Sequence, residues 1–483
     1  MDRSCDFKKK ETCFLHISTP LSVLNFSLPN EAIQLMWLHR YLNFSKHRST
    51  WAYIADFLIR KATKAADRNV DLGTRINMFI QNWEMNMRDQ KYLPTRLIEM
   101  LNVAKKHGVR IDTLKAPKPL RLKFPIWYHI GADPKLARIT RSQGSTCLRR
   151  THGVTTVEDV INFTKRLTTP SIANGEFVRH SFRKNCRCPP CRLDWERGCR
   201  DPDQCSRTAL ELKDSIYPKL APDFLTLKDN LSLTRRRIKK NAKAREENTP
   251  ITFDPSTTDH GDIMDVIRAF TNDRTGFSKL IPPPRIPSNR PGTVPRSVTV
   301  YTDGSSSKNG HENSRVGSGV WFGHNDPRNA SLRIDIPGAN NQTGKLVAIL
   351  VAAQRAPRDA NLHIISDSMY VIDGLTLYLD EWENRGWIGV KNKKLFQAIV
   401  TTLRKRSTVT TFLWTKGHTG TEGNEMADQL AAEGAGKDQP DEIDLKINQN
   451  YILSGCRLAK LTQVLAYRGI IERQDDPPRR GSQ

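Results

Sequence analysis

Apolar positions between residues 297 and 436 follow two alternating patterns, short β-branched runs and longer stretches with helical spacing. The short runs predict strands at residues 298–303, 315–323, 331–337, 362–367 and 409–414. The helical stretches between them lie at residues 341–356, 368–379, 394–406 and 423–433. Alternation of this kind is typical of an α/β domain, in which helices cover a sheet. We therefore predict an α/β fold for residues 296–437.

The rest of the chain divides into further segments by composition. Residues 1–180 carry mostly amphipathic helical patterns, and residues 181–245 form a cysteine-rich and basic segment. The density of proline within residues 246–295 predicts an extended linker, because proline interrupts helices and central strands. Residues 438–483 form a polar tail with one amphipathic helix. The α/β domain is thus expected to follow a mostly helical, basic region.

The charge of the chain indicates a polyanionic partner. Among 483 residues, 76 Lys+Arg stand against 51 Asp+Glu, a formal net charge of +25. Such an excess is typical of nucleic-acid binding, although it also aids solubility. The basic run at residues 234–245 is suited to phosphate contacts or to nuclear import, and a solvated helix face is the alternative.

The sequence predicts neither a membrane span nor a signal peptide. No run of about 18 apolar residues occurs, and no apolar core of signal-peptide length follows the N-terminus. We therefore expect a nuclear or cytoplasmic protein whose partner is nucleic acid and not a membrane.

Three aspartates occupy positions that suit a metal site. Asp303 and Asp367 each end a predicted strand, and Asp428 lies on the last predicted helix. Ligands of open α/β sheets collect beyond the carboxyl ends of the strands, so neighbouring strands would bring Asp303 and Asp367 together. Carboxylate oxygens suit Mg²⁺, and two such ions can activate water for phosphodiester hydrolysis. The alternative is that each aspartate is an ordinary strand-end or surface acid.

The motifs around these aspartates resemble those of the type 1 ribonuclease H family. They read Tyr301-Thr302-Asp303-Gly304-Ser305, Ser366-Asp367-Ser368-Met369-Tyr370, Lys416-Gly417-His418-Thr419-Gly420 and Gly423-Asn424-Glu425-Met426-Ala427-Asp428. The resemblance implies a ribonuclease H-like five-stranded mixed sheet flanked by helices. It also implies endonucleolytic hydrolysis of RNA in RNA–DNA hybrids with Mg²⁺ or Mn²⁺. Asp303, Asp367 and Asp428 would be the catalytic metal ligands, and His418 would assist proton transfer or product release, as suits an imidazole.

The same resemblance suggests which residues contact nucleic acid. Asn341 and Gln342 match positions that hydrogen-bond in the minor groove of the hybrid, where the 2′-OH distinguishes RNA from DNA. The basic handle of the family is matched, in a shorter form, by Trp387, Lys391, Lys393 and Lys394. Aromatic residues with interleaved lysines suit a phosphate track, but they also suit plain packing.

Lys345 stands where the resemblance leads one to expect a glutamate that ligates the metal. The change moves the local charge from −1 to +1, so that three aspartates and one lysine sum to −2, enough for one dication and not two. We predict that Lys345 pairs with Asp303 or Asp367 in place of the metal and that turnover is impaired. A decayed copy, an inactivated enzyme and a rearrangement that recruits another acid all remain open.

Five of the nine cysteines lie between residues 186 and 205. In a reducing compartment such a group favours metal ligands over disulfides. The predicted ligands of one tetrahedral Zn²⁺ site are Cys188, Cys191, Cys199 and Cys205, with His180 as a substitute; the alternative is a loop of free thiols. Cys147 and His152 form one further pair, which we interpret as structural.

The segments outside the α/β domain resemble regions around the ribonuclease H domain of non-LTR retrotransposon polyproteins. The resemblance rests on residues 30–38, the cysteine-rich segment and residues 467–470. It implies that the N-terminal region is the tail that follows a reverse transcriptase; no Tyr-x-Asp-Asp motif occurs, so polymerase activity is not expected. Three hypotheses follow: a ribonuclease H-type nuclease, a non-catalytic binder of hybrids, and a zinc-stabilised interaction module.

Overall fold

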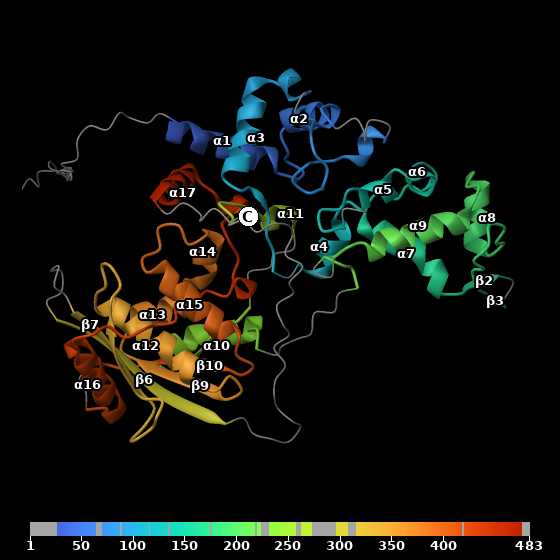
Figure 1. Ribbon diagram of the computed structural model, residues 1–483. Helices are drawn as coiled ribbons and strands as arrows, with labels where there is room; N and C mark the ends of the chain where they lie inside the picture. The colour runs from blue at the N-terminus through green and yellow to red at the C-terminus, as the bar shows by residue number, and fades with distance from the viewer. Residues whose placement is uncertain are drawn as a thin grey trace, which may run out of the picture.

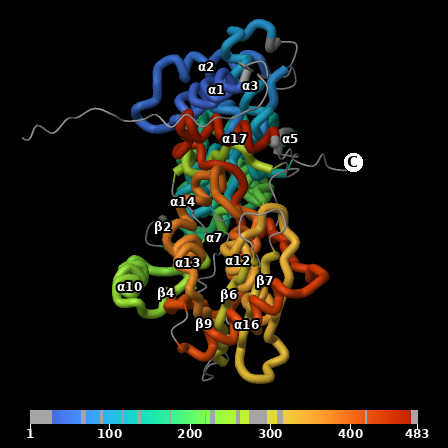
Figure 2. The backbone as a smooth tube through the Cα atoms, turned by 90° about the vertical axis from the view of Figure 1, so that its left-hand side faces the viewer, coloured from blue at the N-terminus to red at the C-terminus, as the bar shows by residue number. Residues whose placement is uncertain are grey.

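The computed structural model describes residues 27–63, 70–86, 89–114, 116–133, 136–173, 176–217, 220–223, 231–256, 262–272, 296–307, 315–417 and 420–475. An α/β body lies at one end of the molecule and the N-terminal helices lie at the other, as both views show (Figures 1 and 2). A third group of helices projects to one side (Figure 1). No described helix combines the length and the apolar character that a membrane span requires.

A six-stranded mixed sheet forms the centre of the α/β body, in the order β4-β10-β9-β6-β7-β8. Its strands are β4 (Ile251–Thr252), β6 (Ser297–Ser307), β7 (Arg315–Trp321), β8 (Ala330–Ile334), β9 (Asn361–Ser366) and β10 (Thr410–Trp414). β6, β7 and β8 form an antiparallel meander, and β9 and β10 run parallel to β6. The predicted mixed sheet is confirmed, and β4 adds one antiparallel edge strand to it.

Helices pack on both faces of this sheet. They are α12 (Asn341–Arg355), α13 (Met369–Thr376), α14 (Leu379–Asn384), α15 (Lys393–Arg404) and α16 (Glu422–Gly436). α12 is buried almost throughout, because it lies between the sheet and α15, and this explains its nearly continuous apolar sequence. Asn340 caps its first turn by accepting the N–H of Thr343, whose hydroxyl accepts the N–H of Asn340 in return. This capping box fixes the start of the helix that carries Lys345.

The segment predicted as an extended linker contains ordered elements, so the structure corrects that prediction. Within residues 246–295, β4 joins the large sheet, and α11 (Ile263–Val266) leads into β5 (Ile267–Ala269). β5 is the middle strand of a small sheet, between β1 (Arg110–Ile111) and β11 (Cys456–Arg457). The prolines on which the prediction rests cluster further on, in residues 273–295, which lie outside the described residues.

The N-terminal helices share one apolar core with the end of the chain. α1 (Ser27–Tyr41), α2 (Thr50–Lys61) and α3 (Thr95–Lys106) pack together, and α17 (Gln463–Asp475) lies against α1. Short 3₁₀ turns occur at Leu72–Thr74, Asp89–Tyr92, Gln449–Tyr451 and Leu458–Lys460. Leu458, Leu465 and Ile470 are buried in this core, so the predicted tail helix packs against the N-terminal region.

The projecting group of helices carries the cysteine-rich segment. It contains α4 (Lys118–Lys123), α5 (Leu136–Thr140), α6 (Gln143–Arg150), α7 (Val157–Thr168), α8 (Pro189–Glu196) and α9 (Pro202–Asp214), with the hairpin β2 (Ser171–Ala173) and β3 (Glu176–Val178). α9 packs against α6, α7 and α8 and so holds the group together. The hairpin and α8 lie at its outer end (Figure 1).

Candidate acidic site and nucleic-acid interface

Asp303 and Asp367 lie at the same edge of the large sheet. β6 and β9 are parallel neighbours, and their register pairs Thr302 with Ser366. The next residue of each strand is the aspartate, so the two carboxylates come together as the strand order predicts. Trp414, at the end of the neighbouring strand β10, donates its indole N–H to the carbonyl of Asp367 at 3.0 Å.

Lys345 lies between these two carboxylates. Its Nζ is 2.8 Å from Asp303 Oδ1 and 2.5 Å from Asp367 Oδ1. The first turn of α12 comes this close because Gly304 has no side chain: a Cβ on Gly304 would lie 2.3 Å from the backbone nitrogen of Lys345. Asp303 and Lys345 are both buried. The predicted pairing of Lys345 is thus present, and it involves both aspartates.

Burial and charge act in opposite directions on the ionisation of Lys345. Burial alone lowers its pKa, but attraction to Asp303 and Asp367 outweighs burial, and the pKa is raised above its usual value. Burial also raises the pKa of Asp303; Lys345 opposes this rise, and the nearby charge of Asp367 adds to it. The ammonium of Lys345 therefore stays charged at neutral pH and serves as the counter-ion of the pair.

Asp428 approaches from the helix that covers the meander. α16 lies directly on β7, because a Cβ on Gly319 would be 1.9 Å from the carbonyl oxygen of Ala427, the residue before Asp428. Among the described residues, however, Asp303, Asp367 and Asp428 do not form a group whose ligand atoms all lie within 4.8 Å of one another. His418 lies outside the described residues, although its neighbour Gly417 is close to Asp367, with a Cβ position 3.3 Å from Oδ2.

The residues present do not fit a pair of magnesium ions. A dication bound between Asp303 and Asp367 would lie next to the ammonium of Lys345, which contacts one oxygen of each carboxylate and would repel the ion. The net charge of the four side chains, three aspartates and one lysine, is −2. Mg²⁺ is usually held in proteins by one or two carboxylates together with waters and substrate phosphates, and an ammonium next to those carboxylates takes the place of the cation.

Asn341 and Gln342 lie in the first turn of α12, next to the acidic pair. Gln342 Oε1 accepts a hydrogen bond from Ser368 Oγ at 3.1 Å, and Ser368 directly follows Asp367. The side-chain oxygen of Asn341 is buried and has no hydrogen-bond partner within the described part of the chain. Both residues thus lie at the edge of the sheet where Asp303 and Asp367 meet, and the amide of Gln342 is held there by Ser368.

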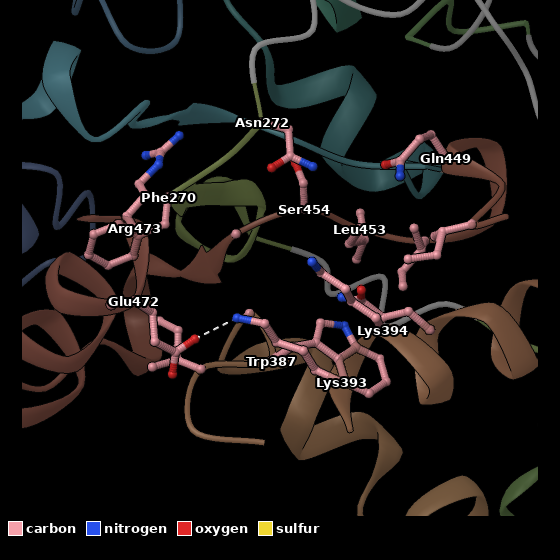
Figure 3. A pocket seen from close by; sticks show the side chains of 17 residues that line it. Phe270, Asn272, Trp387, Lys393, Lys394, Gln449, Leu453, Ser454, Glu472 and Arg473 are labelled. Atoms are coloured by element: carbon pink, nitrogen blue, oxygen red, sulfur yellow. Dashed lines mark hydrogen bonds and ion pairs between the residues drawn. The ribbon is translucent and has the colours of Figure 1, made fainter. Parts of the chain in front are cut away.

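The residues of the predicted basic handle differ in exposure: one is buried in the core and others face solvent. Trp387 is 2% exposed and belongs to the apolar core, so its assignment as a nucleic-acid contact is corrected. Lys393 reaches across a pocket to Glu472 of α17, with Nζ 2.7 Å from Oε2 (Figure 3). Lys391 and Lys394 are exposed. A sequence pattern of aromatics and lysines does not distinguish a core aromatic from a stacking one, and this is why the prediction failed for Trp387.

A basic helix docks beside the large sheet. α10 (Arg235–Glu246) packs next to β4, where Asn241 exchanges two hydrogen bonds with the backbone of Thr252, at 2.7 and 3.0 Å. Arg245 anchors its end to α13, with Nε 3.1 Å from Asp373 Oδ1 and Nη2 2.8 Å from Thr376 Oγ1. Figure 2 shows α10 beside β4 and α13. The exposed basic side chains of this helix are Arg235, Arg236, Arg237, Lys239, Lys240 and Lys243.

The four cysteines predicted as one zinc site separate into two places. Cys188 and Cys191 lie with His180 and Cys186, whereas Cys199 and Cys205 lie with Cys147 and His152. The prediction of a single site is therefore wrong. Spacing alone does not assign Cys147 and His152 to this site, because they lie about fifty residues before their partners; the Cys/His pair itself is the one signal in the sequence.

Comparisons with known proteins concern residues 295–436, which match the family model described as RNase H. Over 147 residues the chain is 35% identical to Ribonuclease H1 of Mus musculus, covering 29% of this chain and 50% of that protein. Over 149 residues it is 33% identical to Ribonuclease H of Pseudomonas aeruginosa, covering 29% of this chain and 95% of that protein. The crystal structure of LC9-RNase H1, a type 1 RNase H, is 25% identical, with 36% of this chain and 87% of that chain covered and a TM-score of 0.26. The chain spans half the length of the mouse relative.

Proposed function

Because the chain belongs to the RNase H family through residues 295–436, which form an α/β domain of ribonuclease H type, we propose that it binds RNA–DNA hybrids without cleaving them. One observation carries the proposal: the ammonium of Lys345 lies between Asp303 and Asp367, 2.8 and 2.5 Å from their oxygens. The family supplies the expectation of hybrid hydrolysis with Mg²⁺ or Mn²⁺. Because Lys345 occupies the position of a metal ligand, we expect this chain to bind the hybrid but not to hydrolyse it.

The charge of Lys345 strongly disfavours binding of a metal ion between Asp303 and Asp367. A unit charge about 4 Å from a dication, at an effective dielectric constant of about 20, costs on the order of 8 kcal/mol before relaxation. Lys345 cannot move away cheaply, because it is buried and its charge is neutralised by the same two aspartates that would hold the metal. We therefore infer that Asp303 and Asp367 act as counter-charges of Lys345, and that Asp303, Asp367 and Asp428 do not act as a two-metal site.

Recognition uses groups that Lys345 leaves intact. Asn341 and Gln342 present amides at the edge of the sheet, where they are suited to the 2′-OH of RNA. Lys391 and Lys394 and the exposed face of α10 supply positive charge for phosphates. The net charge of +25 agrees with this role.

The test compares binding and cleavage of one labelled RNA–DNA hybrid in Mg²⁺. The unaltered chain should bind the hybrid, with affinity that falls as salt rises, and should leave it uncut. Robust cutting by the unaltered chain, abolished in Asp303→Asn, would overturn the proposal. Lys345→Glu restores the charge that the family pattern expects, and we expect metal-dependent cutting to appear in this variant.

Three further predictions rest on the sequence alone. A retrotransposon origin and a nuclear or cytoplasmic location remain predictions, and so does the role of His418 in the family mechanism. An active nuclease remains the competing function, and the cleavage assay with Asp303→Asn decides between the two.

A further inference from the structure

Four ligand groups converge between the β2–β3 hairpin and α8. His180, Cys186, Cys188 and Cys191 place one ligand atom each within 4.8 Å of all the others. His180 Nδ1 is 3.3 Å from Cys191 Sγ and 3.7 Å from Cys188 Sγ. The three cysteines are buried and are free thiols. We refer to this group as the outer cluster, because it lies at the outer end of the projecting helices.

A second group forms where α6 and α9 meet the loop after α8. Cys147, His152, Cys199 and Cys205 also place their ligand atoms within 4.8 Å of one another. Cys199 Sγ and Cys205 Sγ are 3.8 Å apart, and both residues are buried free thiols. The side chain of His152 is 1% exposed, and neither its Nδ1 nor its Nε2 has a hydrogen-bond partner within the described residues. We refer to this group as the inner cluster.

Each histidine lies next to a buried carboxylate. His180 Nε2 is 3.4 Å from Asp203 Oδ1, and His152 Nδ1 is 3.2 Å from Asp194 Oδ1. Histidines that ligate metals usually hold such a carboxylate on the second nitrogen, because it fixes the ring and its tautomer. Both aspartates have an arginine neighbour, Arg207 for Asp203 and Arg166 for Asp194.

These contacts cross between the clusters. α8 carries Cys191 of the outer cluster and also Asp194, which orients the histidine of the inner one. α9 carries Cys205 of the inner cluster and also Asp203, which orients the histidine of the outer one. A change in either cluster would therefore alter the contacts of both α8 and α9.

From this arrangement we propose that residues 147–205 hold two structural zinc ions, one in each cluster of three cysteines and one histidine. A tetrahedral site with Zn–S bonds of about 2.3 Å has sulfur–sulfur edges of about 3.8 Å. The 3.8 Å between Cys199 and Cys205 matches such an edge and is far from a disulfide bond of about 2.05 Å. Three thiolates and one imidazole form a closed structural zinc set, with no position left for a substrate.

The outer cluster has a very small apolar core among the described residues. Its buried apolar group consists of Cys186, Cys188 and Cys191, with Val178 packed against them half-buried. Neighbouring large side chains, Ile172, Phe177 and Phe182, are exposed instead of packed. A segment with so small a core needs a cross-link or a metal to hold one conformation. The zinc ion would take the place of the apolar core here.

Metal content of the purified full chain tests the proposal. Protein purified without chelators should contain two zinc equivalents by elemental analysis. Cys191→Ser and Cys205→Ser should each lose one equivalent, and the double variant should lose both. Cys456→Ser is the matched control, because Cys456 is buried and free but lies in β11, outside both clusters; it should keep two. One equivalent or none in the unaltered chain, or a Cys199–Cys205 disulfide by mass spectrometry, overturns the proposal.

Cobalt substitution tests the proposal independently of the serine variants, one of which could fail to fold. Cobalt exchanged into the unaltered chain should show the intense visible bands of tetrahedral thiolate coordination, saturating at two equivalents. Asp203→Asn leaves all eight ligands in place, and it should speed zinc loss to a competing chelator from the outer cluster, with a 10–100-fold weaker affinity on the order seen for such partners. Zinc loss at an unchanged rate in both Asp203→Asn and Asp194→Asn would contradict the crossed arrangement.

Discussion

Lys345 Nζ lies 2.8 Å from Asp303 Oδ1, and the two side chains neutralise each other in a position from which water is largely excluded. Asp367 shares the same ammonium at 2.5 Å. Lys345 is therefore more than a missing metal ligand. It is the counter-ion on which the two carboxylates depend, and this makes its replacement a test of stability as well as of catalysis.

Lys345→Met should destabilise the domain by about 3 kcal/mol, because it leaves two carboxylates without their buried counter-ion. Mg²⁺ should restore part of this stability, since an ion that binds only the folded state stabilises it by mass action. Thermal or urea unfolding, with and without Mg²⁺, measures both effects.

The unaltered chain is the control for the magnesium effect, and its unfolding should not respond to Mg²⁺. Asp303→Asn in the Lys345→Met background should reduce both the destabilisation and the response to Mg²⁺, because one of the unpaired charges is removed. Equal stabilisation of the unaltered chain by Mg²⁺ would mean that Lys345 does not block the site.

The exposed face of α10 should contribute phosphate contacts. Replacing Arg236, Lys239 and Lys240 by glutamine should weaken hybrid binding and reduce the slope of log K against log[salt] by about 0.9 for each phosphate that is no longer neutralised. Binding measured at several salt concentrations gives the slope. Lys460→Gln is the control for removal of a single exposed charge elsewhere. A slope that stays the same in the triple variant would assign α10 to solvation or import.

Much of the α/β domain is predictable from sequence, because its signals are local. A β-branched run that ends in an acid places Asp303 and Asp367, and parallel pairing of β6 with β9 follows from the α/β pattern. The replacement at Lys345 is visible from motif position, and opposite charge is enough to predict its pairing. These inferences need only neighbouring residues and the general rules of sheet topology.

The predictions that the structure corrects all depend on contacts between residues far apart in the sequence. β4 joins β10 across more than 150 residues, and its two-residue length gives no periodic signal. The inner cluster joins Cys147 to Cys205, and the choice of partner depends on how α6 and α9 pack. Trp387 looked like a stacking residue, yet the tertiary fold buries it. Local patterns do not contain these choices.

The buried pair of Arg404 and Glu383 should couple α15 to α14 and to the segments on either side of the domain. Nη1 of Arg404 lies 2.7 Å from Oε1 of Glu383, and Nη2 lies 2.8 Å from Oε2. Each side chain is 1% exposed. Arg404 also donates to the carbonyls of Tyr451 and Ser256, each at 2.9 Å. Arg404→Met should cost about 3 kcal/mol or more, because Glu383 is left charged and buried.

A double-mutant cycle separates the pair from a simple change in packing. Arg404→Met combined with Glu383→Met should be less destabilising than Arg404→Met alone, since the unpaired charge is gone. Urea unfolding of the four proteins gives the coupling energy. If the effects of the two substitutions on the free energy of unfolding are additive, the unpaired carboxylate of Glu383 is not the main cause of the destabilisation in Arg404→Met.

Gly319 should tolerate no side chain, because it sets how closely α16 approaches β7. A Cβ there would lie 1.9 Å from the carbonyl oxygen of Ala427 and 2.6 Å from the nitrogen of Ala431, both backbone atoms that cannot rotate away. Gly319→Ala should destabilise the domain by about 2–3 kcal/mol and displace Asp428. Gly436→Ala is the matched control, because no described atom lies within 4 Å of its Cβ position, at the last residue of α16; it should change stability by less than about 0.5 kcal/mol. Thermal unfolding of both variants measures the difference, and similar melting temperatures would contradict direct contact of the helix and strand backbones.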